Sequence, residues 1–288
     1  MVISSRAITR SADPKDLSRL ANLVHFEVFV HRHLDYRPPL DWMGYNPFLV
    51  LEQASRIEAA LACPPDPPAI AWIRLFAAAT QIPVTAAWDA LWSKAYHQLL
   101  DDHKILYAAA IPLYSWFEAL LKRNHFQKTH SIVMLGWDGT GLPELPANTT
   151  VSVRPMTLDD LAAVESIDSA SFSLVWQNSR TYLEIAFRQA AVATVAEYKG
   201  QLVGYQISTG TPIGGHLARL AVLPGLQGKG IGYAILYDLL NQFARRGAHM
   251  VTVNTQKDNL ASLSLYHKAG FQMTGEEYPI YQLELPAH

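Results

Sequence analysis

The chain has 288 residues, of which 50% are hydrophobic and 17% are charged, and this composition excludes a disordered protein. The formal net charge of -2 gives no reason to expect a nucleic-acid partner, and one cysteine, Cys63, excludes an internal disulfide. The longest apolar run, 105–113, contains Pro112 and is too short to cross a bilayer. The N-terminal residues lack the apolar segment of a signal peptide, so we expect a cytoplasmic protein that binds neither membranes nor nucleic acids.

An internal repeat organises the chain. The segment 139–150 is rich in Gly, Pro and Thr and has no hydrophobic periodicity, which is typical of a linker between 1–138 and 151–288. Matching residues recur in the two halves at an offset of 144 or 145: Arg10 and Arg154, Asp16 and Asp160, Glu52 and Glu197, Arg74 and Arg219, Phe126 and Phe271. We therefore predict two copies of one fold, of which the first has diverged strongly.

The first copy carries several histidines and many aromatic residues. His25, His31 and His33 lie near Glu27, but no cysteine or carboxylate cluster completes a metal shell, so we expect histidines at a helix end or on the surface and no metal. The aromatic residues are expected to be mostly core: Phe26, Phe29, Trp42, Tyr45, Trp72, Trp88, Trp92 and Trp116.

The second copy alternates strand and helix patterns. Thr157 and Asp160 have the spacing of a capping box, which predicts a helix start there. The expected elements are a strand at 151–155, that first helix, a helix at 178–190, a hairpin of 193–198 and 201–208, a strand at 217–223, a helix from 231, a strand at 250–254, a helix at 260–269, and strands at 271–275 and 278–285.

A glycine-rich turn connects the strand at 217–223 to the next helix. Its sequence, Gln-Gly-Lys-Gly-Ile-Gly over 227–232, puts three glycines and Lys229 at a helix N-terminus, where free N–H groups and the helix dipole favour an anion. The dinucleotide fingerprint fails at Tyr233, and the P-loop fails because Gly230 follows the lysine. We therefore expect a phosphate or pyrophosphate ligand of another class.

The pattern Gln-x-x-Gly-x-Gly resembles the pyrophosphate-binding motif of the GNAT superfamily of N-acetyltransferases, which bind acetyl-CoA there. A second motif follows: Asn259 at a helix start, Tyr266 two turns later, and Gly270-Phe271 at the helix end. This order resembles the last core motif of the same superfamily. The resemblance covers 151–285 and is weak in the first copy.

This resemblance implies an α/β (α+β) fold of two tandem GNAT-like domains, each with a mixed, mostly antiparallel sheet flanked by helices. The sheet of 151–288 would open between the strands at 217–223 and 250–254, and acetyl-CoA would enter that opening as the cosubstrate. The residues implied in cofactor binding are Ala221, Val222, Leu223, Gln227, Gly228, Lys229, Gly230, Ile231, Gly232, Asn254, Asn259 and Tyr266.

The resemblance also implies that Tyr266 protonates the CoA sulfur. Glu197, Tyr205 and His216 border the expected opening as possible bases, and we favour His216 because its ordinary pKa suits the task. Arg219, on the same strand, cannot act as a base. The first copy has none of these features, since it carries Leu121 at the position of the tyrosine and the residues Pro83, Thr85 and Ala87 at those of the glycines.

The predicted activity is N-acetyltransfer from acetyl-CoA to an amine by direct attack, with catalysis in the C-terminal domain. The alternative is an acyl-CoA-binding sensor or scaffold without turnover. The acceptor would be a small molecule or peptide with an amine, and the chain a monomer or weak dimer. Phe172, Trp176 and Tyr182 are expected on the acceptor side, but the sequence does not identify the acceptor.

Overall fold

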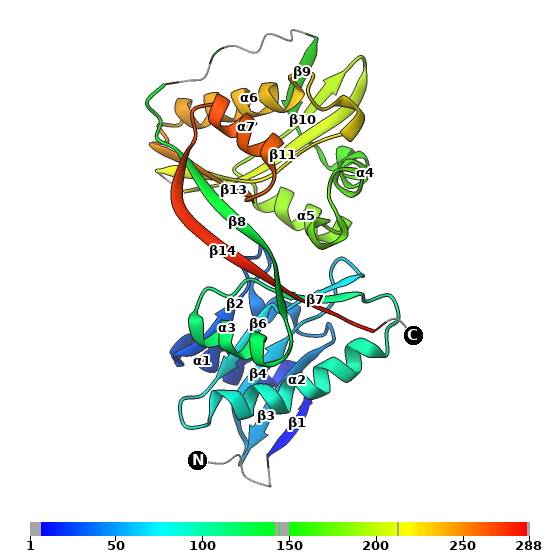
Figure 1. Cartoon of the computed structure of the whole chain (residues 1–288), viewed down its shortest axis with the longest axis vertical. Coiled ribbons are helices and arrows are strands. Elements are labelled where there is room, and N and C mark those ends of the chain that lie inside the picture. The colour runs from blue at the N-terminus through cyan, green and yellow to red at the C-terminus, as the bar shows by residue number, and fades with distance from the viewer. Residues whose placement is uncertain (1–6, 142–143, 145–149, 212, 287–288) are drawn as a thin grey trace. The chain divides into compact units, whose positions relative to one another are not determined.

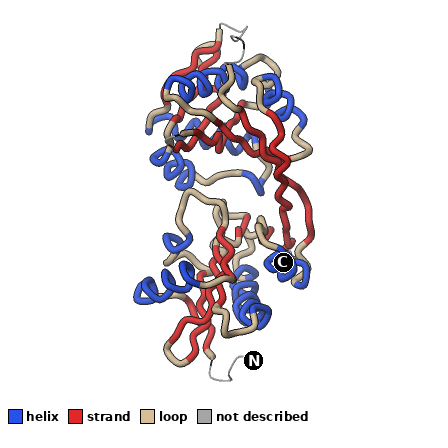
Figure 2. Tube along the Cα trace, turned by 90° about the vertical axis from the view of Figure 1, so that its left-hand side faces the viewer, coloured by secondary structure: helices blue, strands red, loops and turns tan. Residues whose placement is uncertain are grey.

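The computed structural model describes residues 7–141, 144, 150–211 and 213–286. The expected linker, 139–150, lies mostly outside these described residues. The chain forms two units, of which one comprises Met1–Thr129 with Pro279–His288 and the other His130–Tyr278. Helices flank sheets in both units (Figure 1, Figure 2), in agreement with the predicted mixed fold.

The first unit builds an antiparallel sheet in the order β1-β3-β4-β6-β2, and a separate strand, β5, pairs in parallel with β7. Its elements are β1 (Ile8–Ser11), η1 (Pro14–Asp16), α1 (Leu17–Phe26), β2 (Phe29–Arg32), η2 (Pro39–Trp42), β3 (Phe48–Gln53), β4 (Arg56–Ala62), β5 (Ile70–Trp72), β6 (Leu75–Ala78), α2 (Val84–Leu100), β7 (Tyr107–Ala110) and α3 (Ser115–Arg123).

The second unit has strands in the order β13-β12-β11-β10-β9, with β12 and β13 parallel and the other pairs antiparallel. Its elements are β9 (Val151–Pro155), η3 (Leu158–Asp160), α4 (Leu161–Ser171), η4 (Leu174–Trp176), α5 (Arg180–Gln189), β10 (Val192–Tyr198), β11 (Gln201–Thr211), β12 (Gly214–Val222), η5 (Pro224–Leu226), α6 (Ile231–Arg245), β13 (Met250–Gln256) and α7 (Leu260–Lys268).

Helices cover both faces of the second sheet. A side chain at Gly204 of β11 would meet Ile235 of α6, whereas the next residue, Tyr205, donates a hydrogen bond to Asp168 of α4. Because neighbouring residues of a strand point to opposite faces, α6 and α4 lie on opposite sides. We call these sides the α6 face and the α4 face; α7 shares the α6 face, since its Tyr266 joins the same apolar cluster as the α6 residues.

Each unit receives its closing strand from the other half of the sequence. β8 (Gln127–Trp137) ends the first copy, but its residues Ile132–Trp137 pair with β13 in the second unit. β14 (Gln272–Glu284) ends the second copy, but its residues Tyr281–Glu284 pair with β7 in the first unit. The units therefore divide at 130 and 279, whereas the repeat in the sequence divides at 138 and 151. The two strands expected at 271–275 and 278–285 are one continuous strand.

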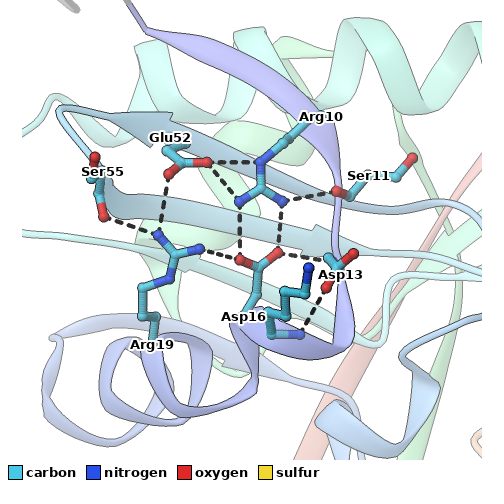
Figure 3. Close-up of polar contacts among 8 residues, drawn as sticks. Arg10, Ser11, Asp13, Asp16, Arg19, Glu52 and Ser55 are labelled. Atoms are coloured by element: carbon cyan, nitrogen blue, oxygen red, sulfur yellow. Dashed lines mark hydrogen bonds and ion pairs between the residues drawn. The ribbon is translucent and has the colours of Figure 1, made fainter.

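The two copies share an ion network that the sequence repeat pointed to. Arg10 donates from Nε to Glu52 at 2.7 Å and from its terminal nitrogens to both oxygens of Asp16, at 2.6 and 2.9 Å (Figure 3). Arg154 donates from Nε to Glu197 at 2.7 Å and to both oxygens of Asp160 at 2.8 Å. The residues that correspond at the expected offset therefore make the same contacts, which supports the prediction of two copies of one fold.

This network fastens the first strand of each copy to the turn that starts its first helix. The capping box of Thr157 and Asp160 is present as predicted, with the Thr157 N–H donating to Asp160 at 2.7 Å. The Arg154 hydrogen bond is the largest cause that lowers the pKa of Asp160, from 3.8 to about 2. The equivalent bond from Arg10 lowers the pKa of Asp16 as well.

Several expectations for the first copy need correction. His31 and His33 were expected at a helix end or on the surface, but His31 is fully buried against Phe117, and burial lowers the pKa of both. Phe26 was expected in the core but is 75% exposed, because it lies at the end of α1 beyond the apolar stripe of that helix. No group of residues able to hold a metal ion, and no helix long and apolar enough to cross a membrane, occurs within the described part of the chain.

The Arg154 network gives a pH-dependent stability. We expect Asp160→Asn to lower the free energy of unfolding by about 2 kcal/mol at pH 7, because the variant loses charge-assisted hydrogen bonds. A carboxylate with a lowered pKa stabilises the fold above its ordinary pKa, and this stabilisation is lost as the pH falls through the folded-state value of about 2. The difference from the wild type should therefore shrink between pH 4 and pH 2, as measured by urea unfolding.

The matched control is Asp159→Asn, which changes the exposed neighbouring carboxylate and should be nearly neutral. An equal loss in both variants, or a difference for Asp160→Asn that persists at low pH, would contradict the assignment.

Candidate functional site

The site begins where two parallel strands separate. β12 and β13 pair only over Gly214–Leu217 and Met250–Val253, although β12 continues to Val222 and β13 to Gln256. The separation coincides with a register shift between β12 and β11 at Ala218. A bulge adds a residue and bends its strand, so β12 turns away from β13 at this point. The predicted opening between the two strands is therefore present.

The strand alternation decides which β12 amides face this opening. The Leu223 N–H donates to the Val203 carbonyl oxygen at 2.9 Å, so Leu223 bonds to β11. In an antiparallel ladder, alternate residues bond to the same neighbour, so Ala221 also faces β11 and the amides of Val222 and Leu220 point outward. Of the three amides expected to bind the cofactor, only that of Val222 is directed to the opening. Leu220, which the sequence analysis did not select, joins it.

The glycine turn and the start of α6 form an anion site beside the opening. Gly228 and Gly230 have φ of 76° and 81°, a conformation that favours glycine. The first hydrogen bond within α6 runs from the Ala234 N–H to the Gly230 carbonyl oxygen, so the four amides of 230–233 are not used inside the helix. A Cβ at Gly232 would lie 3.3 Å from Leu265 of α7, so this glycine lets the two helices approach closely.

Gln227 and Asn259 have local structural tasks. The Gln227 side-chain amide donates to the Val222 carbonyl oxygen at 3.1 Å, which ties the turn to the end of β12. Asn259 caps α7, because its side-chain oxygen accepts from the Ser262 N–H at 3.1 Å. A second structural bond, from the Ser171 hydroxyl to the Val222 carbonyl oxygen at 3.2 Å, holds the end of α4 against the same point of β12.

Tyr266 lies on the α6 face. It is 5% exposed and packs with Val253, Phe271 and the inner side of α6. Burial raises the pKa of its phenol, and the structure records no hydrogen bond for this hydroxyl among the described residues. The group is therefore a protonated donor that has no partner within the described chain.

His216, Thr252 and Asn254 lie on the α4 face. Leu217 and Val253 pack on the α6 face, so the preceding residues of each strand, His216 and Thr252, point the other way. The His216 Nδ1 lies 2.8 Å from the Thr252 hydroxyl, which itself lies 3.5 Å from the Gly215 carbonyl oxygen. In the tautomer that lets Thr252 donate to Gly215, Nδ1 carries the proton and donates to Thr252. This leaves the His216 Nε2 lone pair available, and burial lowers the pKa of the ring.

A buried ion pair on the α4 face joins β12 to α4. The Arg219 Nε donates to Asp168 at 2.8 Å, its guanidinium lies 3.4 Å from the centre of the Phe172 ring, and another of its nitrogens donates to the Trp176 carbonyl oxygen. Tyr205 donates its hydroxyl proton to the same Asp168 carboxylate, which is fully buried. The contacts of Arg219 thus connect β12 with α4 and with the residues expected near the acceptor.

These contacts narrow the set of possible bases. Glu197 is engaged by Arg154, and Tyr205 is a buried donor whose pKa is raised by burial. Of the three candidates from the sequence, only His216 lies on a strand that borders the opening, since Glu197 is on β10 and Tyr205 on β11. Sequence patterns could not have shown this, because the partners of Glu197 and Tyr205 come from distant segments.

A cavity of about 460 Å³ lies next to the first turn of α6 and the end of α7. Its walls include Trp137, Tyr233 and Lys268, and the Lys268 ammonium lies 4.8 Å from the centre of the Tyr233 ring. Aromatic surface and a cation are thus placed beside the glycine turn.

The family comparison agrees with this geometry. Residues 161–271 match the model of the acetyltransferase (GNAT) family, and this range contains the opening, the glycine turn and Tyr266. This similarity to the GNAT family lies within the second copy and does not reach the first.

Curated relatives resemble mainly this domain. A putative ribosomal protein bS18-alanine N-acetyltransferase of Bacillus subtilis is 25% identical over 44% of the chain and 84% of that protein. The N-alpha-acetyltransferase RimI of Mycobacterium tuberculosis is 38% identical over 29% of the chain and 54% of its own length. The spore coat polysaccharide biosynthesis protein SpsD of Bacillus subtilis is 34% identical, but the match covers only 29% of either chain.

Solved structures resemble the whole chain. A GCN5-related N-acetyltransferase from Sphaerobacter thermophilus has a TM-score of 0.64 at 14% identity, covering 98% of this chain and 97% of its own. A tandem GNAT protein from the clavulanic acid biosynthesis pathway has a TM-score of 0.64 at 16% identity, covering 98% and 99%. At these identities the likeness concerns the fold, and it confirms the predicted tandem GNAT arrangement.

The first GNAT-like copy lacks the opening. Its β5 pairs in parallel with β7, as β12 does with β13, and β6 then continues along β4. In the second copy, β12 separates from β13 after Leu217. In the first copy, the corresponding strand, β6, pairs with β2 over Leu75–Ala78. The glycines are also missing, as the sequence indicated. A strand of the protein thus occupies the edge that a cofactor arm would need.

The buried pair of Arg219 and Asp168 can be tested for its role in holding the α4 face. We expect Asp168→Leu alone to lower the free energy of unfolding by about 3–5 kcal/mol, because it leaves a buried guanidinium without its counter-charge. The double variant Asp168→Leu/Arg219→Met should recover much of this loss, since the uncompensated charge is gone. Denaturant unfolding of Asp168→Leu, Arg219→Met and the double variant checks the prediction, and a double variant that loses the sum of the two single effects would overturn it.

Proposed function

We propose that the chain is an N-acetyltransferase that binds one acetyl-CoA in its second copy, 151–288, and transfers the acetyl group directly to an amine. One observation carries the proposal: the opening between β12 and β13 lies beside a helix start whose first four amides make no hydrogen bond within α6. A thioester arm needs such an open strand edge, and a pyrophosphate needs such a helix start. A sensor or scaffold without turnover would need neither a general acid such as Tyr266 nor a general base such as His216.

The cosubstrate would extend along the opening. The amides of 228–232 would hold the pyrophosphate, with Lys229 as an added cation, and the outward N–H groups of Leu220 and Val222 would bind the pantetheine arm and the thioester carbonyl. The cavity beside Tyr233 and Lys268 would receive the adenosine end.

The two faces of the sheet would then divide the chemistry. An acceptor approaches from the α4 face, where His216 Nε2 takes a proton from the ammonium, directly or through a water, and the neutral amine attacks the thioester carbon. The C–N bond forms and the C–S bond breaks. On the α6 face, Tyr266 donates to the leaving sulfur as negative charge develops there. The nitrogen then loses a second proton, which replaces the one that Tyr266 gave to the sulfur, while His216 passes the first proton to solvent. The products are the amide, CoA as a thiol and one proton.

The acceptor is proposed only as a class. The relatives named above include a putative ribosomal protein bS18-alanine N-acetyltransferase and an N-alpha-acetyltransferase, and another relative is named L-methionine sulfoximine/L-methionine sulfone acetyltransferase. A peptide with N-terminal alanine and L-methionine sulfone are therefore the first acceptors to test.

Calorimetric titration with acetyl-CoA tests the cofactor site. We expect one site per chain, because β2 covers the strand edge of the first copy. Gly230→Asp should abolish binding, since it adds negative charge and a strained side chain where the pyrophosphate must lie. Two sites per chain, or equal binding by the variant, would contradict the assignment.

The matched control is Gly247→Asp, at the other end of α6. Gly247 also has a positive φ of 75°, and no atom lies near its Cβ position, so this variant carries the same strain and charge far from the ligand. It should bind acetyl-CoA like the wild type.

Kinetics of Tyr266→Phe and His216→Gln test the proton transfers. We expect Tyr266→Phe to keep its acetyl-CoA affinity and to lower kcat by roughly 10²-fold, as is usual for loss of a general acid. The wild-type rate should rise with pH as His216 loses its proton, with a midpoint below the ordinary value of 6.5 because burial lowers that pKa. His216→Gln should lose this dependence.

Thiol release followed at several pH values measures both effects. Binding of acetyl-CoA without amine-dependent thiol release by the wild type would favour the sensor instead. A Tyr266→Phe enzyme with unchanged kcat would remove the tyrosine from the mechanism.

A further inference from the structure

Asn254 carries a buried hydrogen-bond acceptor that nothing in the described chain satisfies. Its side-chain Oδ1 is inaccessible to solvent and has no partner. A buried polar atom without a partner destabilises a fold by roughly 1–3 kcal/mol, so such an atom at the edge of an opening needs an explanation. The glycine turn and Tyr266 do not provide one, because they lie in other parts of the site.

The position of Asn254 is defined by the strand register. Val253 is the last β13 residue that pairs with β12, so Asn254 is the first residue beyond the separation of the strands. On its other side it pairs with Met134 of β8. The backbone of Asn254 is therefore fixed by β8, while its edge toward β12 faces the opening.

The side chain of Asn254 lies on the α4 face. Val251 and Val253 pack in the cluster of the α6 face, and the residues between and after them, Thr252 and Asn254, point the opposite way. Tyr266 belongs to the α6 face, so Asn254 and Tyr266 lie on opposite sides of the sheet. This arrangement suits a site in which Tyr266 contacts the leaving sulfur from one side and Asn254 contacts the attacking amine from the other.

The charges near Asn254 favour a donor ligand over an anion. Arg219 is already paired with Asp168, and His216 has a lowered pKa and is neutral at pH 7. Oδ1 accepts hydrogen bonds and cannot donate them. A primary amine or its ammonium form carries several N–H groups: one can bond to Oδ1 while another proton passes to His216.

We infer that Asn254 positions the acceptor amine, in place of the cofactor contact expected from its sequence position. The inference rests on the proposed function and deepens it. Oδ1 accepts an N–H of a primary amine on the α4 face and holds its nitrogen toward the thioester carbon. Asn254 takes no proton and forms no covalent bond, so it is a binding and positioning residue.

The test compares Asn254→Leu and Asn254→Asp with the wild type. Leucine removes the acceptor atom, whereas aspartate keeps it and adds charge. The probes are a peptide with N-terminal alanine, L-methionine sulfone and n-butylamine, each assayed by thiol release over a range of amine concentrations, and acetyl-CoA affinity is measured by calorimetry. Asn241→Leu is the control, since it makes the same change at a partly buried position of α6.

We expect Asn254→Leu to raise the KM for the amine at least tenfold and to keep the acetyl-CoA dissociation constant within twofold. Asn254→Asp should keep or lower the KM for the amine, and Asn241→Leu should behave as the wild type. If Asn254→Leu does not fold, Asn254→Val, which suits a strand and also lacks an acceptor atom, replaces it, and the expectation for KM is the same.

Two results would overturn the inference. Weaker acetyl-CoA binding with an unchanged KM for the amine would assign Asn254 to the cofactor site, and no change in either constant would make its role structural. Failure of the proposed function looks different. In that case the wild type binds no acetyl-CoA, or binds it and releases no thiol with any of the three amines.

Discussion

The short parallel pairing of β12 and β13 is the constraint on which the second copy depends. Four residue pairs hold the strands together, and a bulge at Ala218 then turns β12 away while the strand remains bonded to β11. Because β12 remains paired with β11 and separates from β13, the amides of Leu220 and Val222 face the opening. Arg219, directly after the bulge, anchors the diverging strand to Asp168 of α4. An opening with fixed walls thus arises from backbone pairing, and the side chains on its two faces can take different tasks.

The two copies show which features are needed for the fold and which for the site. Both keep the arginine that joins the first strand to the first helix turn, with the same bonds to two carboxylates. Both also keep a buried arginine at the corresponding position: Arg74, between β5 and β6, pairs with Asp35, and Arg219 of β12 pairs with Asp168. The first copy differs where a ligand would enter, since β2 pairs with the free edge and the glycine turn is absent. The shared ion pairs therefore support the architecture, and the open edge is specific to the second copy.

Much of this could be predicted from the sequence because the signals are local. The glycine turn, the capping box at Thr157 and the strand and helix periods of the second copy depend on residues close together in the chain, and the structure agrees with them. The pairing of β2 with β6, the use of the Leu223 amide by β11 and the partners of Glu197 and Tyr205 depend on segments far apart. Composition and residue spacing do not show which of these distant segments will pair. The partner of His216 and the unsatisfied oxygen of Asn254 became visible only with the strand register.

The exchange of closing strands has a consequence for the order in which the chain folds. The core of the first unit includes Tyr281 and Leu285, and the Tyr281 hydroxyl donates to Glu118 of α3 at 2.7 Å. During synthesis these residues emerge after the entire second copy. The first unit therefore lacks part of its core until β14 has been synthesised, after the second copy. The two halves of such a chain therefore do not fold as independent domains, one after the other. A cut at the linker would leave each half with the strand that completes the other unit.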